Sequence, residues 1–569
     1  MKRTFFLLIL TFATATAAIA QDKAAKIEEM VKKYQEYGQF NGAVLVAENG
    51  KVIHKKGYGM ANMEWGIAVS PDTKFRIGSV TKQFTAAIIL QLVDEGKIKL
   101  DAKMTEYLPK YRKETGDKVT IHHLLNHTSG IPSYTNGVFF REHSRDPYTV
   151  DEFVEKFTQG DLEFEPGSKF RYNNSGYFLL GAIIEKVTGN SYADELKKRI
   201  LDPLGMKNTG YDTSSPLIKN RAQGYDKVPG GYRNAAYLDM GLPYAAGSMY
   251  STVEDLYTWD QALYTDKVLS AESKAKMFTP GLQNYGYGFS IRDQKIGKTD
   301  KTTKIIAHGG GINGFNCLLT RLVDGKHLIV ILDNVSQGQY HNAMTRNVIN
   351  ILNGLPYDSP KMSIAEALHD TANKQGGAAA VAQYRKFKQD DPEKYDFSEN
   401  ELNNLGYQLL GAGKTKDAIE IFKLNIEMFP KAFNPYDSLG EAYLKAGDKI
   451  NALANYKKSV ELNPDHVGGK AAIAKIEGRE VKVDNSELTK YEGEYDGGPI
   501  GKIKIWVDGT RLMAQPAGQS EQELTPQGKG VFFVASVNAK VTFESDSDGK
   551  TTALVINQNG QELNAPKLK

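Results

Sequence analysis

Ser79 and Lys82 stand three residues apart at the start of a run with helical spacing of apolar residues, which includes Phe84, Ile88 and Leu92. Residues three apart on a helix face the same way, with Cβ atoms about 5–6 Å apart. A serine hydroxyl becomes a useful nucleophile when a neighbouring base takes its proton, and a lysine whose pKa is lowered by burial can be that base. The pair predicts nucleophilic catalysis, although Ser79 could instead be a helix N-cap.

Two further segments carry residues that would complete such a site. Tyr172 stands two residues before Asn174, so the phenol could relay a proton while the amide holds the lysine and a substrate carbonyl. The run 308–311 is a histidine followed by three glycines. A glycine-rich strand lets a substrate approach the backbone closely, and it exposes N–H groups to a developing oxyanion.

The order and spacing of these segments resemble the penicillin-recognising serine hydrolases. The branch of this family that the chain resembles includes class C β-lactamases, D-Ala-D-Ala carboxypeptidases and related esterases. The resemblance runs through about the first 350 residues, in the family's order. It rests also on the stretches 75–78, 124–132, 164–167, 177–181, 203–206 and 246–252.

The resemblance implies a role for each of these residues. Ser79 would be the acylated nucleophile, Lys82 its base, and Tyr172 the group that carries a proton to the leaving atom. The residues expected to bind substrate are Asn174, which would also orient the lysine, and His308, Gly309 and Gly310. The oxyanion hole would be the backbone N–H groups of Ser79 and Gly311. The mechanism requires no cofactor and no metal.

His308 departs from the Lys-Thr-Gly that many β-lactamases carry at this place. A lysine is a permanent cation for a substrate carboxylate, whereas a histidine titrates near neutrality and is often uncharged. Histidine here resembles the esterase, D-aminopeptidase and amidase members. The alternative is a histidine that only packs at a strand end.

Three histidines, His122, His123 and His127, raise the question of a metal site, because positions 123 and 127 would be one helical turn apart. A zinc site needs three or four ligands with supporting partners, and no His-Glu-x-x-His or cysteine pair accompanies these residues. A turn that shapes the wall of the active site explains them better.

The segments that must position the site predict an α+β catalytic domain at 21–355. A helix is expected from Ala24 to Tyr37, a hairpin over 41–60, and paired apolar strands from Ile305 to Asp333. Helices between strands of one antiparallel sheet suit the design of the similar family, with the site where the sheet meets a helical region.

A helical linker or cap is predicted at 356–398, followed by repeats at 399–480. Four features recur at an offset of 34 residues: Leu405-Gly406 and Leu439-Gly440, Gly413 and Gly447, Ala418 and Ala452, and Pro430 and Pro464. This period is similar to that of tetratricopeptide (TPR) repeats, which pair two helices per unit. Helices at 364–388 and 469–476 would cap the array. The repeats could bind a protein or peptide, or be a structural spacer.

Short alternating runs separated by turn residues fill the rest of the chain and predict a small antiparallel β domain at 484–569. It resembles the β domain often appended to this branch of hydrolases. No chemistry is evident in it.

The first 20 residues combine Lys2 and Arg3, an apolar run and a small-residue ending. This composition predicts a secretory signal peptide cleaved after Ala20, and hence a periplasmic or secreted protein. No later run is apolar enough to span a membrane. With 71 basic and 68 acidic residues, the balanced charge gives no electrostatic case for binding nucleic acid.

The leading hypothesis is therefore a secreted serine hydrolase that forms an acyl-enzyme on an ester, amide or D-amino-acid peptide bond. A β-lactamase or D-Ala-D-Ala carboxypeptidase is the nearest alternative, with the same mechanism on another small-molecule or peptide substrate. A non-catalytic adaptor that works through the repeats is the alternative from a different class.

Overall fold

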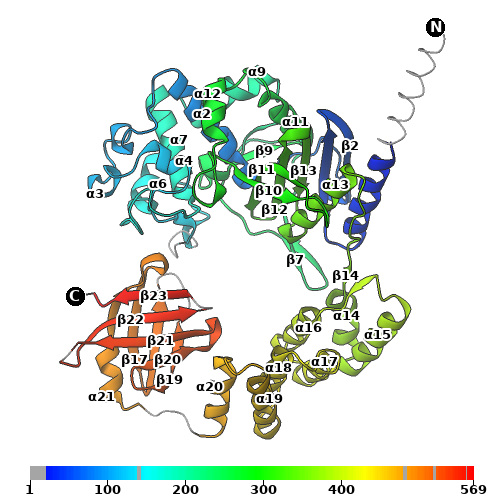
Figure 1. Cartoon of the computed structure of the whole chain (residues 1–569), viewed down its shortest axis with the longest axis vertical. Helices are drawn as coiled ribbons and strands as arrows, with labels where there is room; N and C mark the ends of the chain where they lie inside the picture. The colour runs from blue at the N-terminus through cyan, green and yellow to red at the C-terminus, as the bar shows by residue number, and fades with distance from the viewer. Residues whose placement is uncertain are drawn as a thin grey trace. The chain divides into compact units, whose positions relative to one another are not determined.

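The computed structural model describes residues 21–136, 142–213, 215–478, 483–516, 521–546, 548–558 and 561–568. The chain forms two compact units, Met1–Pro360 and Lys361–Lys569 (Figure 1). The predicted signal peptide, residues 1–20, lies outside the described residues, so its cleavage stays a prediction.

A six-stranded antiparallel sheet forms the centre of the first unit, in the order β10-β11-β12-β13-β1-β2. Its strands are β1 (Gly42–Glu48), β2 (Lys51–Tyr58), β10 (Ser290–Lys295), β11 (Thr302–Ile312), β12 (Phe315–Leu322) and β13 (His327–Asp333). The predicted hairpin is confirmed: Asn49 and Gly50 join β1 to β2, both with positive φ, as a tight hairpin turn requires. The predicted paired strands between Ile305 and Asp333 are also confirmed.

The two faces of this sheet pack against different helices because successive side chains in a strand point to opposite faces. Val44 and Ile331 lie under a helix at 21–36 and under α13 (His341–Leu352). Leu45 and Val330 on the other face belong to the core that holds α2 (Thr81–Asp94) and α11 (Val253–Ala262) (Figure 1). This second face is the one that carries Ser79.

A helical region, inserted between strands β2 and β10, packs against α2. Its helices are α3 (Lys113–Gly116), α4 (Ile121–Leu125), α6 (Val150–Phe157), α7 (Asn174–Thr188), α8 (Tyr192–Leu196), α9 (Asp202–Leu204), α10 (Tyr244–Gly247) and α12 (Ala271–Met277). Short strands between β2 and β10 form small sheets of their own, separate from the six-stranded one: β3 (Met60–Asn62), β4 (Ile67–Ala68), β5 (Phe75–Arg76), β6 (Gly210–Tyr211), β7 (Tyr225–Val228), β8 (Gly231–Asn234) and β9 (Met249–Ser251). The expected α+β class is confirmed for this unit.

The second unit begins with helices and ends with strands. Its helices are α14 (Ile364–Lys374), α15 (Gly377–Asp390), α16 (Glu399–Gly411), α17 (Thr415–Met428), α18 (Phe433–Lys445), α19 (Lys449–Leu462) and α20 (Val467–Ile476), and β14 (Met362–Ser363) pairs with β15 (Tyr395–Asp396). The single helix predicted over 364–388 is wrong. Gly376 has a φ of 93°, which ends the first helix, and the Gly377 N–H donates to Asp417 at 2.8 Å.

The 34-residue offset reappears in the geometry of helices α16 to α19. Gly406 and Gly440 are 34 residues apart, and a Cβ at these positions would lie 2.3 Å from Phe422 and 3.1 Å from Tyr456, which are also 34 apart. Each glycine therefore allows its helix to approach the following one closely. The assignment of these helices to TPR repeats stays a prediction.

The β domain is a meander of eight antiparallel strands, paired in chain order. They are β16 (Gly493–Asp496), β17 (Lys502–Asp508), β18 (Arg511–Pro516), β19 (Gln522–Gly528), β20 (Val531–Val534), β21 (Ala539–Ser545), β22 (Thr551–Gln558) and β23 (Gln561–Pro566), preceded by α21 (Asn485–Leu488). A bridge between Tyr495 and Lys567 links the first and last strands, so the sheet nearly closes on itself. The predicted small β domain is confirmed as β-rich.

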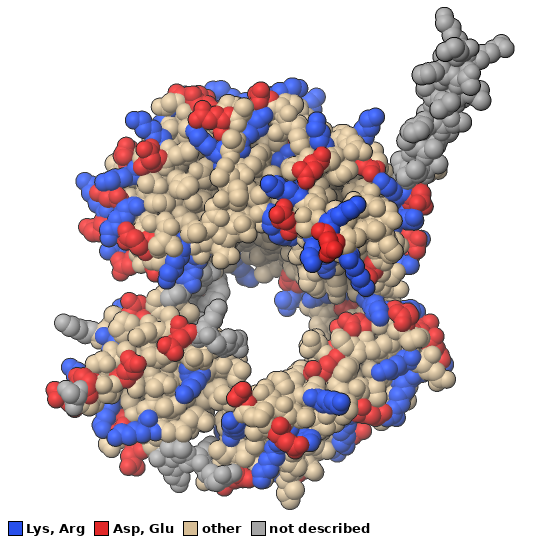
Figure 2. All heavy atoms as spheres, viewed as in Figure 1, with Lys and Arg blue, Asp and Glu red and all other residues tan. Residues whose placement is uncertain are grey.

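Charged side chains of both signs are interspersed on the face of the molecule drawn in Figure 2. This mixture fits the near balance of 71 basic and 68 acidic residues. Among the helices that the structure describes, none has the length and apolar character needed to cross a membrane.

Candidate active site

Ser79 lies in a single 3-10 turn, Gly78–Val80, that leads directly into α2. Gly78 has a φ of 49°, a left-handed conformation that glycine adopts without strain. The alternative of Ser79 as a helix N-cap is wrong, because α2 begins at Thr81 and no side chain caps it. The half-buried hydroxyl is left free to face the neighbouring residues of the site.

Lys82 is fully buried, and its Nζ lies within hydrogen-bonding distance of three oxygens. Nζ is 3.0 Å from Ser79 Oγ, 2.8 Å from Asn174 Oδ1 and 2.8 Å from the carbonyl oxygen of Ala246. Burial lowers the pKa of Lys82 well below the usual lysine value. The oxygens of Asn174 and Ala246 only accept, so a neutral amine directs both of its N–H groups to them. Its lone pair is then left facing the Ser79 hydroxyl.

Asn174 is the first residue of α7, and the residue before it fixes its position. Asn173 caps the helix by accepting from the Gly176 N–H at 2.9 Å. The Asn174 amide nitrogen donates to Thr135 at 3.2 Å, which leaves Oδ1 directed at the lysine. Sequence reasoning missed Asn173 and Thr135. The cap could have been found, because asparagine directly before an apolar helical run is a common start signal.

Tyr172 packs near Lys82, His127 and His308, and its ring centroid is 6.0 Å from that of the His308 ring. Its ring lies 4.9 Å from Lys82 Nζ, and its ring centroid is 4.4 Å from that of His127. Removal of the phenol from water raises the pKa of Tyr172, and a hydrogen bond with Ser79 lowers it. Tyr172 is 38% exposed as a residue, so part of it remains in contact with solvent.

Strand β11 passes the Ser79 turn in direct backbone contact. A Cβ at Gly310 would lie 1.9 Å from the carbonyl oxygen of Ile77 and 3.2 Å from the Ser79 nitrogen, and one at Gly78 would lie 2.9 Å from the nitrogen of Gly311. The N–H groups expected to form the oxyanion hole therefore stand on two segments in van der Waals contact. Strand β10 pairs only with 302–307, so within the described sheet the outer edge of 308–312 is unpaired and open to a substrate.

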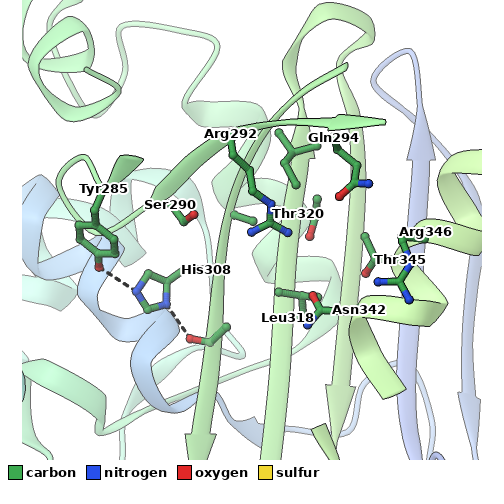
Figure 3. A pocket seen from close by; sticks show the side chains of 13 residues that line it. Tyr285, Ser290, Arg292, Gln294, His308, Leu318, Thr320, Asn342, Thr345 and Arg346 are labelled. Atoms are coloured by element: carbon green, nitrogen blue, oxygen red, sulfur yellow. Dashed lines mark hydrogen bonds between the residues drawn. The ribbon is translucent and has the colours of Figure 1, made fainter. Parts of the chain in front are cut away.

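His308 is neutral and has both ring nitrogens engaged (Figure 3). Nδ1 lies 2.6 Å from the Gly309 carbonyl oxygen, which only accepts, so Nδ1 carries the proton and Nε2 accepts from the Tyr285 hydroxyl at 2.8 Å. Burial and then the charge of Lys82 lower the pKa of His308 to about 3. Titration near neutrality, the sequence-based expectation, is therefore wrong for this buried ring.

The three histidines considered for a metal are separated by the local backbone. Helix α4 ends at Leu125, and His127 adopts a φ of 61°, so the expected one-turn spacing from His123 is wrong. His122 contacts the Tyr287 hydroxyl at 2.6 Å, and His127 accepts from the Asn173 N–H at 3.1 Å. Among the described residues, no group of three or more His, Cys, Asp or Glu side chains could hold a metal ion.

The arrangement as a whole can activate a hydroxyl and receive a carbonyl compound. Ser79 stands between a lysine with a lowered pKa and a phenol, and two backbone N–H groups lie beside it. A neutral amine accepts a proton, the phenol can pass one on, and N–H groups stabilise negative charge on oxygen.

Most of the first unit is similar to proteins of known family. Residues 26–353 match the family described as Beta-lactamase, and residues 478–566 match a second family, described as Domain of unknown function (DUF3471). Penicillin-binding protein 4* of Bacillus subtilis (strain 168) is 32% identical over 364 residues, which are 60% of this chain and 78% of that protein.

Two further proteins match the same part of the chain. Teichoic acid D-alanine hydrolase of Staphylococcus aureus is 29% identical over 310 residues, 54% of this chain and 73% of that protein. The crystal structure of FmtA from Staphylococcus aureus superposes with a TM-score of 0.50 at 26% identity, covering 59% of this chain and 90% of that one.

Proposed function

Because the chain belongs to the β-lactamase family and is a serine hydrolase, we propose that Ser79 forms an acyl-enzyme on an ester, amide or D-amino-acid peptide bond. The observation that supports this most directly is the buried Lys82 amine, which has two pure acceptors beside it and Ser79 Oγ at 3.0 Å. A protonated, solvated lysine could not take the hydroxyl proton.

In the proposed acylation, Ser79 Oγ attacks the substrate carbonyl carbon while its proton passes to Lys82. The negative charge that develops on the carbonyl oxygen is stabilised by the N–H groups of Ser79 and Gly311. Tyr172 delivers a proton to the leaving oxygen or nitrogen as its bond to carbon breaks, and it is reprotonated from Lys82. Asn174 binds both Lys82 and the substrate carbonyl, and it thereby keeps the two groups aligned.

In the proposed deacylation, water replaces the alcohol or amine that has left. Lys82 takes one proton from the water, directly or relayed through the Tyr172 phenol, as the water oxygen attacks the acyl carbon. The bond from the acyl carbon to Ser79 Oγ then breaks, and Ser79 Oγ receives that proton back from Lys82. The products are a carboxylic acid and the regenerated enzyme.

The neutral state of His308 favours substrates that have no carboxylate beside the bond that is cleaved. It places no fixed cation beside Gly309 and Gly310, so a substrate carboxylate gains no ion pair there. Removal of D-alanine from an ester or amide needs no such cation, because the acyl group carries an ammonium and no carboxylate. The relative named teichoic acid D-alanine hydrolase supports this choice.

A penicillin-binding or D-Ala-D-Ala carboxypeptidase role is the second candidate, favoured by the 32% identity to penicillin-binding protein 4*. The predicted signal peptide would carry either enzyme out of the cytoplasm. Cell-envelope substrates are found outside it. A TPR-type array at 399–480 would add a site for a protein or peptide partner beside catalysis.

The test is turnover by the 21–569 protein beside its Ser79→Ala variant, on p-nitrophenyl acetate, D-alanine methyl ester, D-alaninamide and a chromogenic cephalosporin. We expect ester and D-alanyl turnover that is lost in the variant, and an acyl adduct whose mass maps to the peptide containing Ser79. Ser270→Ala, a helix cap elsewhere in the same unit, is the matched control. Turnover that survives in Ser79→Ala would overturn the mechanism, and cephalosporin cleavage above D-alanyl cleavage would favour the second candidate.

A further inference from the structure

A cavity of about 490 Å³ lies on the opposite face of the sheet from Ser79, between β10, β11, β12 and α13 (Figure 3). Arg292 and Gln294 line it from β10, Thr320 from β12, and Thr345 and Arg346 from α13. The alternation of strand β11 explains this placement: Gly310 faces the serine, and Ala307 and Gly309 face the cavity.

The cavity is positively charged. None of the residues that line it is acidic. Arg292 and Arg346 are both exposed, and within the part of the chain that the structure describes neither has an ion-pair partner. Figure 3 shows their guanidinium groups entering from opposite walls, one from the edge strand and one from the helix. Two unneutralised guanidinium groups around one space are suited to an anion with several oxygens.

Thr345 provides an independent observation. Its side chain is 6% exposed, lines the cavity, and has an Oγ1 atom with no hydrogen-bond partner. A buried hydroxyl without a partner is unfavourable, and native structures rarely leave one so. A threonine in a helix can usually donate to the carbonyl four residues earlier, and Thr345 does not. The hydroxyl of this cavity-lining residue therefore has a hydrogen bond that the described protein groups leave unused.

The cavity shares a wall with the candidate active site. Tyr285, His308 and Gly309 line it, and Tyr285 holds His308 at 2.8 Å on the strand that carries Gly310 and Gly311. A substrate long enough to pass the edge of β11 can therefore place its acyl bond at Ser79 and a later group in the cavity.

We propose that this cavity is a subsite for an anionic phosphate or carboxylate group carried by the substrate beyond the bond that is cleaved. The inference rests on the proposed function, since it assigns that function a substrate class: acyl groups attached to an anionic chain. Arg292 and Arg346 bind the anionic oxygens, and Thr345 donates one further hydrogen bond. His308 supplies no cation beside the acyl group. Arg292 and Arg346 supply positive charge farther along the substrate instead.

The first experiment compares two substrates of the full 21–569 protein: D-alanyl esters on a short glycerol phosphate oligomer, and D-alanine methyl ester, which has the same acyl group and no anionic group. Arg292→Gln and Arg346→Gln are each expected to lower kcat/KM for the oligomer about tenfold, the loss expected for a hydrogen bond to a charged group. Turnover of the methyl ester should change little. Lys295→Gln, which removes the same charge from the same strand outside the cavity, is the control.

The second experiment separates the subsite from catalysis. Inorganic phosphate and acetate are titrated into Ser79→Ala, followed by NMR or calorimetry, with and without Thr345→Val. Thr345→Val removes only the hydroxyl, so the free protein should stay folded and no less stable, while phosphate binding weakens.

Equal losses on the methyl ester and the oligomer would overturn the subsite, and so would an oligomer rate that does not change in either arginine variant. Phosphate that binds at the arginines and alters the methyl ester rate, with no preference for the oligomer, would show a free anion site and also overturn it. No turnover of any D-alanyl substrate by the wild type would instead refute the choice of D-alanyl substrates made under the proposed function.

Discussion

Lys82 illustrates how burial turns an ordinary surface residue type into a base. Burial of the charged amine away from water costs free energy, which lowers its pKa. The three oxygens at 2.8–3.0 Å hold the neutral form in a defined orientation. His308 is uncharged for the same reason but has no free nitrogen. Two neighbouring titratable groups thus have different capacities for proton transfer.

The pH profile of turnover should report Lys82. Below its lowered pKa the amine is protonated and has no lone pair, so kcat/KM for a neutral ester falls as pH falls through that value, well below 10.5. His308→Gln should leave this acidic limb in place, because a ring with a pKa of about 3 does not titrate there. A fall in kcat/KM near the ordinary lysine pKa, or one that is lost in His308→Gln, would contradict the assignment of this pH dependence to Lys82.

Tyr172→Phe keeps the ring contacts with His127 and Lys82 and removes only the hydroxyl that interacts with Ser79. We expect kcat to fall at least about a hundredfold, since general acid–base groups contribute at least that much. Tyr237→Phe, at an exposed position of the same unit, controls for loss of a phenol. An unchanged rate would remove Tyr172 from the mechanism.

At the scale of elements, the site depends on how closely β11 approaches the turn before α2. Neither segment positions a reacting group alone: the turn carries Ser79 and the strand carries Gly311. Glycine at 78 and at 310 permits the contact, since a Cβ at either place would meet backbone atoms at 2.9 Å or less. This contact, rather than the strand sequence itself, would shape the proposed oxyanion hole.

Gly310→Ala should therefore lower turnover at least about a hundredfold, comparable to loss of an oxyanion donor, because its Cβ would lie 1.9 Å from the Ile77 carbonyl oxygen and push the strand away. Gly231→Ala, on β8 of the same unit, is the control, since a Cβ there would meet no heavy atom within 4 Å. Kinetics and thermal unfolding of both variants provide the measurement. Equal activity in the two would show that the close approach is not needed.

At the scale of the whole molecule, the two units have separate cores. The buried clusters of Met1–Pro360 contain no residue of the second unit, and the clusters around Leu405 and Phe543 contain none of the first. Domains with their own cores can generally fold alone.

A protein of residues 21–360 should therefore keep the kcat and KM of the 21–569 protein for p-nitrophenyl acetate to within about twofold, as expected for an independently folded domain. The comparison needs only soluble protein and steady-state kinetics. Far-ultraviolet circular dichroism confirms folding. A folded fragment that has lost activity would show that the second unit contributes to catalysis on even the smallest substrate.

The sequence by itself determined the candidate catalytic residue types, the α+β class of the first unit, the hairpin within 41–60 and the β-rich end of the chain. These follow from local spacing: three residues on a helix, two on a strand, and glycine or asparagine at turns. The 34-residue offset was likewise readable, since it is a property of the chain alone.

Only the tertiary structure decided the charge state of His308, the break at Gly376 and the cavity beyond the sheet. Burial among Tyr285 and Gly309 sets the pKa of the histidine, and these partners come from different segments. Arg292 and Arg346 are 54 positions apart in sequence, and no local pattern relates them. They meet around one cavity because a sheet and a helix bring distant residues together, and spacing along the chain does not encode that distance.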